Sequence, residues 1–148
     1  MIRLPPPLVM GGFGTLAYGT KFIATVDWLG DYHILLAAIC TLLAGSFIAP
    51  SVVAFAKEKT TVNPYTPKRS TTLVRTGVYS LSRNPMYLAM ALALLAWCAY
   101  LDNLLNLVSV VGFVVYMNEL QIEFEERILL QIFGEQYVEY CSQVRRWI

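Results

Sequence analysis

Four long apolar stretches dominate the pattern of hydrophobic and polar positions along this chain. They cover approximately residues 8–29, 33–56, 86–101 and 104–120. A helix needs about 20 mostly apolar residues to cross a bilayer, so each stretch is predicted to be a transmembrane helix. The last two stretches are short and tightly joined, which predicts a helical hairpin. The first is the weakest, since Lys21 and several glycines interrupt it, and a helix lying at the membrane interface is the alternative.

Beyond residue 120 the polarity changes, yet a helical pattern continues. The apolar residues of one predicted stripe are Leu120, Phe124, Ile128 and Leu129. Glu123 can pair with Arg127 four residues later, and Gly134 is a natural helix stop. A second short helix is predicted from the helical spacing of Tyr137, Tyr140, Cys141 and Val144. Residues 121–148 are therefore predicted to be an amphipathic helical segment outside the membrane.

Composition agrees with a single membrane-embedded domain over residues 1–148. The chain has 148 residues, of which 57% are hydrophobic and 14% charged, with a mean hydropathy of +0.54. A soluble domain carries about 25% charged residues. A net charge of +1 does not point to nucleic acid as a partner. Three scattered cysteines and one histidine provide neither a disulfide framework nor the spacing of a metal site, so we expect no metal.

Charge placement predicts the orientation of the spans. Asp27, Asp31 and Asp102 lie near the turns on one side, where there is no lysine or arginine. The basic residues of the other side are Arg3, Lys57, Lys59, Lys68, Arg69, Arg75, Arg83, Arg127, Arg145 and Arg146. By the positive-inside rule, both termini and the loop at 57–85 are cytoplasmic, in a multi-pass protein of the cell membrane. The closing Arg145, Arg146 and Trp147 are expected to face anionic headgroups.

The segment TTLVRTGVYSLSRNPMYLAM, residues 71–90, places a polar loop directly before the third apolar stretch. Gly77 allows a turn, and Pro85 disfavours helix at Asn84 but fits the first turn of a helix. A helix start beside Arg83 and Asn84 can hold a carboxylate or another polar ligand group. Helix capping combined with membrane anchoring by Arg83 is the alternative interpretation.

The pair Glu125–Glu126 follows the fourth stretch by about one helical turn. Adjacent helical residues point about 100° apart, so at most one carboxylate can face a given pocket. An ordinary solvated helix face is the alternative. The predicted hairpin brings RNPMY, residues 83–87, close to this pair. A cytoplasmic pocket with donors on one side and a carboxylate on the other suits a zwitterionic or cationic ligand.

Five short motifs occur in order over the second half of the chain. They are LVRTGVY (73–79), RNPMY (83–87), EERIL (125–129), FGEQY (133–137) and VRRWI (144–148). In these motifs the sequence resembles the isoprenylcysteine carboxyl methyltransferase family, which is related to the phospholipid methyltransferases. The segment TTVNP, residues 60–64, is similar to the small bacterial branch. The resemblance extends from about residue 60 to the end of the chain.

The resemblance implies an S-adenosylmethionine-dependent methyltransferase that lacks a Rossmann domain and releases S-adenosylhomocysteine. The implied fold is an all-α integral membrane protein with four transmembrane helices and a C-terminal cytoplasmic amphipathic helical segment. The implied cofactor-binding residues are Thr71, Thr72, Leu73, Val74, Gly77, Tyr79, Asn84, Pro85, Met86, Tyr87 and Glu125. The catalytic candidates are Arg83, Tyr87 and Glu126. The implied partners are the lipid bilayer and a lipophilic small-molecule acceptor.

Two residues depart from the family pattern, and other functions remain open. Asn84 stands where eukaryotic members have histidine, and Gln121 stands where members acting on isoprenylcysteine have an arginine. The acceptor could therefore be a prenylated thiol or carboxylate, a small thiol, a phospholipid amine or a quinone-like lipid. An NADPH-dependent, steroid-reductase-like oxidoreductase is one alternative, with Lys68, Arg69 and Arg75 near a phosphate. A small non-catalytic membrane protein is another.

Overall fold

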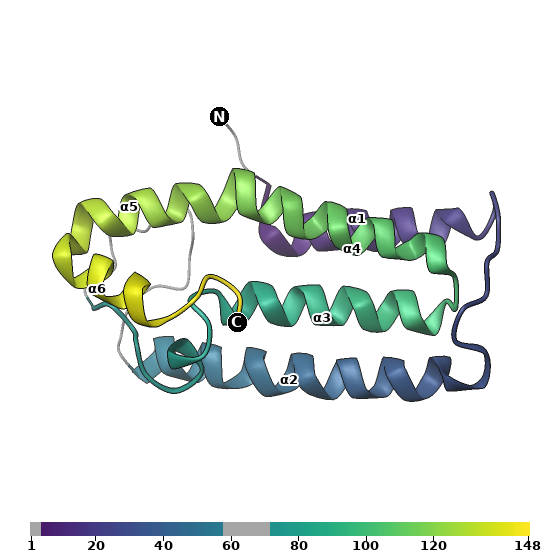
Figure 1. Cartoon of the computed structure of the whole chain (residues 1–148), viewed down its shortest axis with the longest axis horizontal. Coiled ribbons are helices and arrows are strands. Elements are labelled where there is room, and N and C mark those ends of the chain that lie inside the picture. Colours follow the sequence, from purple (N-terminus) through teal and green to yellow (C-terminus); the bar gives the residue numbers. More distant parts are fainter. Residues whose placement is uncertain (1–3, 58–71) are drawn as a thin grey trace.

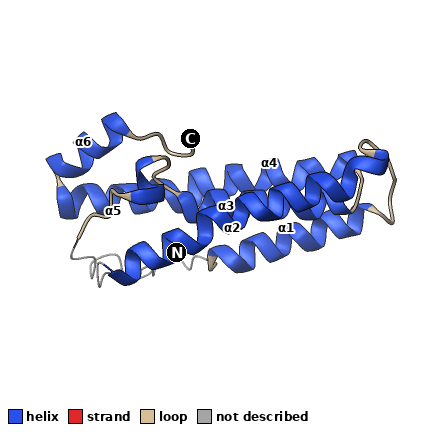
Figure 2. Ribbon diagram, turned by 90° about the horizontal axis from the view of Figure 1, so that it is seen from below, coloured by secondary structure: helices blue, strands red, loops and turns tan. Residues whose placement is uncertain are grey.

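The computed structural model describes residues 4–57 and 72–148, and every regular element in these two ranges is helical (Figure 2). The α-helices are α1 (Pro6–Thr20), α2 (His33–Lys57), α3 (Pro85–Tyr100), α4 (Leu107–Tyr116), α5 (Glu123–Phe133) and α6 (Glu135–Gln143). A π-helical turn, Met117–Ile122, joins α4 to α5. Short 3₁₀ turns cover Gly30–Tyr32, Gly77–Ser80 and Leu104–Asn106. For the described residues, the prediction of an all-α fold is confirmed.

The helices form an elongated bundle in which α3 is central. Helix α2 packs along α3, while α1 contacts both α3 and α4. Figure 1 shows α4 and α5 as one long rod, with α6 folded back beside α5 at one end. The buried cluster of the bundle combines residues of α1, α3 and α4, among them Val9, Ala17, Leu94, Cys98 and Phe113. The start of α3 therefore lies at the same end of the bundle as α5 and α6.

Two helical stretches, Gly30–Ala54 and Leu104–Phe133, are long and apolar enough to cross a membrane. Helix α3 is also apolar but has 16 residues. At 1.5 Å per residue it is about 24 Å long, against a hydrocarbon core of about 30 Å. Among the described residues there are thus two candidate membrane spans and the shorter apolar helix α3, and the prediction of four transmembrane helices is not confirmed.

The first predicted span, residues 8–29, is wrong in its second half. Helix α1 ends at Thr20, and Lys21 is an exposed residue at its end rather than inside a span. The chain then runs without regular helix against the α3–α4 turn, where the Asn103 side chain accepts a hydrogen bond from the Val26 N–H at 3.2 Å.

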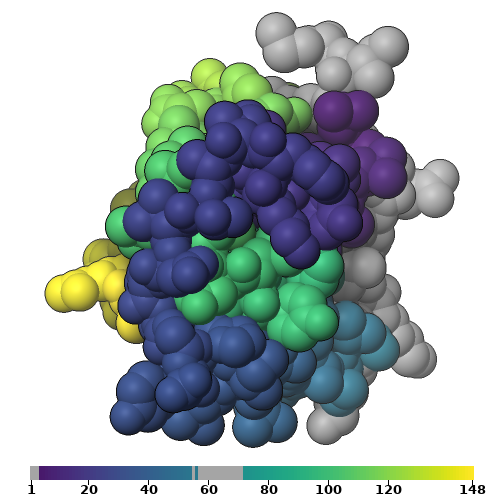
Figure 3. All heavy atoms as spheres, turned by 90° about the vertical axis from the view of Figure 1, so that its right-hand side faces the viewer, coloured from purple at the N-terminus to yellow at the C-terminus, as the bar shows by residue number. Residues whose placement is uncertain are grey.

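The neighbouring Asp102 side chain acts in the same way on the following residues. Its Oδ1 accepts hydrogen bonds from the N–H groups of Leu29, at 2.9 Å, and Trp28, at 3.4 Å. Side chains that satisfy backbone donors compete with helix formation, which explains the early end of α1. Figure 3 looks onto this end of the molecule, where residues in the twenties and thirties, in dark blue, lie over the green hairpin.

The predicted stripe through Leu120, Phe124, Ile128 and Leu129 is also wrong at its start, because of the π-helical turn. Along α4 the buried positions recur every four residues, at Ser109, Phe113 and Met117. Ile122, five residues further on, is again fully buried, whereas Leu120 is 44% exposed. A π-helical turn accommodates one extra residue and so rotates everything that follows. Compared with an uninterrupted α-helix, the residues of α5 that face the bundle therefore come one position later in the sequence, toward Glu126.

Candidate functional site

The start of α3 has the form that its sequence predicts. Pro85 is the first residue of the helix. The carbonyl of Asn84 accepts hydrogen bonds from the N–H groups of Tyr87 and Leu88, both at 3.0 Å. The first turn of a helix has no intrahelical acceptors for its N–H groups. Since Pro85 has no N–H, the N–H of Met86, for which no acceptor is found among the described residues, can serve a ligand at this helix start.

Tyr87 and Glu125 connect the two arms of the hairpin. The hydroxyl of Tyr87, on α3, donates a hydrogen bond to Oε1 of Glu125, on α5, at 2.6 Å. Nε2 of Gln121 donates to the same oxygen, also at 2.6 Å, from the π-helical turn. Two short hydrogen bonds fix the orientation of the carboxylate. The structure thus brings RNPMY and the glutamate pair together, as the hairpin predicts.

Glu126 points to a different set of partners. Its carboxylate receives two hydrogen bonds from Arg146, at 2.6 and 3.1 Å, and lies 3.3 Å from the guanidinium of Arg83. The hydrogen bonds to Glu126 raise the pKa of Arg146 above its ordinary value. The expectation that adjacent glutamates serve different surroundings is confirmed. Arg83 also donates to Sγ of Cys141, while its Nε is buried and has no hydrogen-bond partner among the described residues.

The tail, residues 144–148, lies across the start of α3. The N–H of Arg83 donates to the carbonyl of Arg145 at 3.0 Å. The side-chain amide of Asn84 donates to the carbonyl of Arg146, also at 3.0 Å. These bonds to the main chain close the loop before α3 on one side. The Asn84 amide, which is a predicted cofactor ligand, is therefore occupied by the tail through its nitrogen.

The sequence predicts that Arg145, Arg146 and Trp147 face lipid headgroups. In the structure, two of these three side chains turn toward the protein instead. Nε1 of Trp147 donates to the side-chain oxygen of Asn118 at 3.0 Å, and the ring packs against the buried cluster of the bundle. Arg146 faces Glu126, and only Arg145 of the three residues is exposed. A partly buried carboxylate in direct contact attracts an arginine more strongly than a distant surface charge, so Arg146 turns toward Glu126.

Tyr79 lies in the turn that Gly77 makes possible, as predicted. Gly77 has φ of +64°, a conformation that favours glycine. The side chain of Tyr79 is 6% exposed, hydrogen-bonds with Ser51 on α2, and its carbonyl accepts the hydroxyl of Tyr140 at 2.6 Å. Burial raises the pKa of Tyr79 well above its ordinary value, and the charge of Glu125 adds to the rise. Tyr79 and Glu125 therefore share one environment.

The remaining positions of the predicted adenine loop lie beside α6. Leu73 packs against the cluster that contains Tyr137, and Val74 is buried. Thr72 is exposed, while Thr71 lies outside the described residues. Within the predicted loop at 57–85, the described residues before Tyr79 therefore pack against α6.

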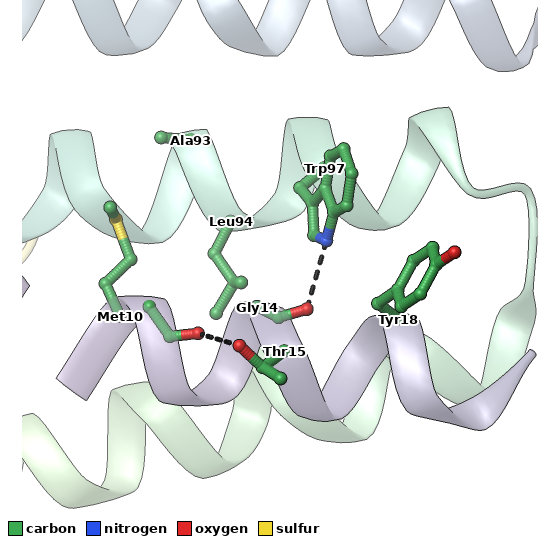
Figure 4. A pocket seen from close by; sticks show the side chains of 8 residues that line it. Met10, Gly14, Thr15, Tyr18, Ala93, Leu94 and Trp97 are labelled. Carbon is green, nitrogen blue, oxygen red and sulfur yellow. Dashed lines mark hydrogen bonds between the residues drawn. The ribbon is translucent and has the colours of Figure 1, made fainter. Parts of the chain in front are cut away.

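An open cavity lies away from these residues, between α1 and α3. Its volume is about 490 Å³, and it is lined by Met10, Gly11, Gly14, Thr15, Tyr18, Ala93, Leu94 and Trp97 (Figure 4). Nε1 of Trp97 donates to the carbonyl of Gly14 at 3.1 Å, which holds the indole as one wall. Ala93 follows Tyr87 by six residues, about 9 Å along the helix. We call this cavity the α1–α3 groove.

Sequence reasoning missed two contacts of the glutamate pair. Arg146 and Glu126 are 20 residues apart, and their pairing depends on where the tail lies in space. Gln121 donates to Glu125 four residues later, a spacing at which helical side chains meet. The sequence singles out Gln121 only as a departure from the family pattern.

The chain matches a family model and two known proteins. A family model described as phospholipid methyltransferase matches residues 32–136, a range that contains both Tyr87 and Glu125. An uncharacterized protein of Haemophilus influenzae is 43% identical over 63 residues, which are 43% of this chain and 100% of that protein.

A second relative has an assigned activity. The protein-S-isoprenylcysteine O-methyltransferase of Saccharomyces cerevisiae is 38% identical over 77 residues, which are 49% of this chain. The match covers 30% of the yeast enzyme, so less than a third of that protein is compared. No solved structure matches the chain.

Proposed function

Because the chain belongs to the phospholipid methyltransferase family, we propose that it transfers a methyl group from S-adenosylmethionine to a lipophilic small-molecule acceptor. The reaction takes place at a membrane that the protein crosses several times, with both termini in the cytoplasm. The partners are the bilayer and the acceptor. The isoprenylcysteine methyltransferase name of the yeast relative and the long apolar helices both support this proposal.

The hydrogen bond between Tyr87 and Glu125 is the observation that carries the proposal. It joins the RNPMY motif to the glutamate pair across the hairpin, at 2.6 Å. Both residues are half-buried, and the charge of Glu125 contributes to the raised pKa of Tyr79. A carboxylate held in this way supplies a fixed negative charge, which suits a positively charged ligand group.

The surrounding residues fit the two ends of the amino-acid part of S-adenosylmethionine. Glu125 would hold the ammonium group or the ribose hydroxyls. Nε of Arg83, buried without a partner in the described part of the chain, and the N–H of Met86 would hold the carboxylate. Tyr79 and residues 72–74 would line the side of the adenine. A buried guanidinium nitrogen that lacks an acceptor is otherwise costly, so a ligand carboxylate relieves it.

When bound, S-adenosylmethionine supplies a methyl group on a sulfonium, whose carbon–sulfur bond breaks as the acceptor bonds to that carbon and S-adenosylhomocysteine leaves. The protein contributes proximity, alignment and exclusion of water. Tyr87 lines the reacting region, whereas Glu126 holds Arg83 and the tail in place through their guanidinium groups. His33, the single histidine of the chain, lies at the opposite end of the bundle. We therefore favour an acceptor that is already anionic, such as a thiolate or carboxylate, which needs no base.

The reductase-like alternative is less well supported. It requires basic side chains around the 2′-phosphate of NADPH. Arg75 is paired with Glu139 at 3.5 Å, and Lys68 and Arg69 lie outside the described residues. The family match also favours methyl transfer over hydride transfer.

Calorimetric titration of the detergent-solubilised protein tests the proposal. We expect saturable binding of S-adenosylhomocysteine and no binding of NADPH. A screen of lipid acceptors with labelled methyl donor then follows. Binding of NADPH alone would overturn the proposal in favour of the reductase, and binding of neither would favour a protein without catalytic function.

A further inference from the structure

We propose that the α1–α3 groove binds the hydrocarbon chain of the methyl acceptor while the acceptor's reactive head lies beside Tyr87. This inference rests on the proposed methyltransferase function and adds a second binding site to it. The site recognises a single unbranched or prenyl-like chain of sufficient length, entering from the bilayer.

The lining of the groove suits hydrocarbon and offers little to a polar group. Two of its hydrogen-bonding side chains are already used within the protein. The hydroxyl of Thr15 donates to the carbonyl of Gly11 at 2.9 Å, and Nε1 of Trp97 donates to the carbonyl of Gly14 (Figure 4). Removal of apolar surface from water favours the binding of a hydrocarbon chain in such a groove. A groove of about 490 Å³ has room for such a chain.

Two glycines keep the groove open. A Cβ atom added at Gly11 would meet no other atom within 4 Å. One added at Gly14 would lie 3.8 Å from Leu94, in ordinary contact. Larger residues at these positions would therefore fill the space rather than disturb the packing of α1 on α3. The groove exists because these side chains are missing, and the hydrogen bond of Trp97 to the Gly14 carbonyl fixes the indole as one of its walls.

The groove continues the line of the polar site along α3. Tyr87, Met90, Leu94 and Trp97 follow one another at intervals of three, four and three residues, which places them on one face of the helix. Tyr87, Met90 and Met10 also pack against the same buried cluster. A chain that leaves a head group at Tyr87 and follows this face enters the groove after about 9 Å.

The position of the groove makes chain length the variable to test. An acceptor whose chain is shorter than about 9 Å cannot reach the groove from Tyr87. A long chain reaches it and gains the buried area. Bulk lipid, by contrast, would fill the groove without any relation to the head of the acceptor. Closing the groove should therefore have different effects if it holds the acceptor's chain than if it holds bulk lipid.

The experiment closes the groove with Gly11→Leu and uses Gly12→Leu as the matched control. Gly12 is on the same helix, is exposed, has equal open space around its Cβ, and does not line the groove. The probes are n-butyl and n-hexadecyl forms of the same thiol or carboxylic acid, with labelled S-adenosylmethionine. We expect G11L to raise KM for the hexadecyl probe about tenfold, leaving the butyl probe and the affinity for S-adenosylhomocysteine unchanged. G12L should match wild type throughout.

Equal effects of G11L and G12L, or an unchanged KM for the hexadecyl probe in G11L, would overturn the proposal and leave the groove to bulk lipid. If G11L does not fold, Ala93→Phe closes the same groove from α3, with the same expectation. Retained binding of S-adenosylhomocysteine separates failure of this inference from failure of the methyltransferase function. The latter would appear in wild type as loss of cofactor binding and of turnover with both probes.

Discussion

The hydroxyl of Tyr87 lies 2.6 Å from Oε1 of Glu125, and this hydrogen bond joins the first turn of α3 to the first turn of α5. The same oxygen receives the amide of Gln121 from the π-helical turn. Three elements thus converge on one carboxylate. The position of that carboxylate depends on the hairpin, the helix start and the π-helical turn together, and each can be tested separately.

Removing the Tyr87 hydroxyl should weaken cofactor binding. Tyr87→Phe keeps the ring and loses a hydrogen bond to a charged group, for which a loss of about 1.5–3 kcal/mol is typical. We expect the affinity for S-adenosylhomocysteine to fall at least tenfold in calorimetry. Tyr100→Phe, at the exposed far end of α3, is the control. Wild-type affinity in Y87F would mean that this bond does not position the site.

The tail should be held mainly by one arginine. Arg146→Ala removes both hydrogen bonds to Glu126, whereas Arg145→Ala changes an exposed side chain and keeps the carbonyl that Arg83 binds. Because Arg146 is partly exposed, we expect a loss of only about 1–2 kcal/mol in unfolding free energy. Chemical denaturation in detergent measures it. Equal losses in the two variants would contradict the assigned contacts.

Changing the length of the π-helical turn should show how it sets the orientation of Glu125. Met117 and Ile122 are both fully buried and five residues apart, so deletion of Leu120, an exposed residue, leaves them four apart, as in an α-helix. Glu125 then still faces Tyr87, and binding of S-adenosylhomocysteine should be retained. Insertion of one alanine after Leu120 rotates α5 by about 100° and should abolish binding while circular dichroism stays helical. Loss of binding in the deletion variant would contradict this assignment of the extra residue.

Alkaline conditions should destabilise the protein through its buried tyrosines. Burial raises the pKa of Tyr79 and of Tyr140, so the folded state favours their neutral forms. An unfolded tyrosine ionises near pH ~10, so this stability is complete below that pH and is lost as pH rises above it. The free energy of unfolding should fall less steeply in Tyr79→Phe than in wild type. Tyr32→Phe, at an exposed position, should leave the slope unchanged.

Much of the fold follows from local signals in the sequence. Pro85 begins α3 and Gly134, with φ of +52°, ends α5, because proline and glycine restrict or permit backbone conformations wherever they occur. The pair Glu123–Arg127 forms at 3.8 Å, as its spacing of four residues predicts. Tyr87 meets Glu125 for a similarly simple reason, since a hairpin places the ends of its two arms side by side.

Other features could not be predicted, because they depend on non-local competition. The length of α1 is decided by Asp102 and Asn103, more than 70 residues away, whose side chains take backbone donors that a longer helix would use. No residue pattern in the sequence indicates the π-helical turn. A prediction that assumes a continuous α-helix therefore assigns the inward face of α5 one residue too early. From the sequence, Arg146 is predicted to contact lipid headgroups, because its pairing with Glu126 can be recognised only in the structure.

The tail also sets an order of events in biosynthesis. Asn84 and the carbonyl of Arg146 that it binds are separated by 62 residues. At about 5–20 residues per second, a ribosome needs roughly 3–12 s to make that stretch. During that interval α3 has already emerged, and Glu126, once made, can pair with Arg83 but not yet with Arg146. The nascent chain therefore passes through a stage in which its hairpin is complete but its polar end is still open to solvent and to quality control.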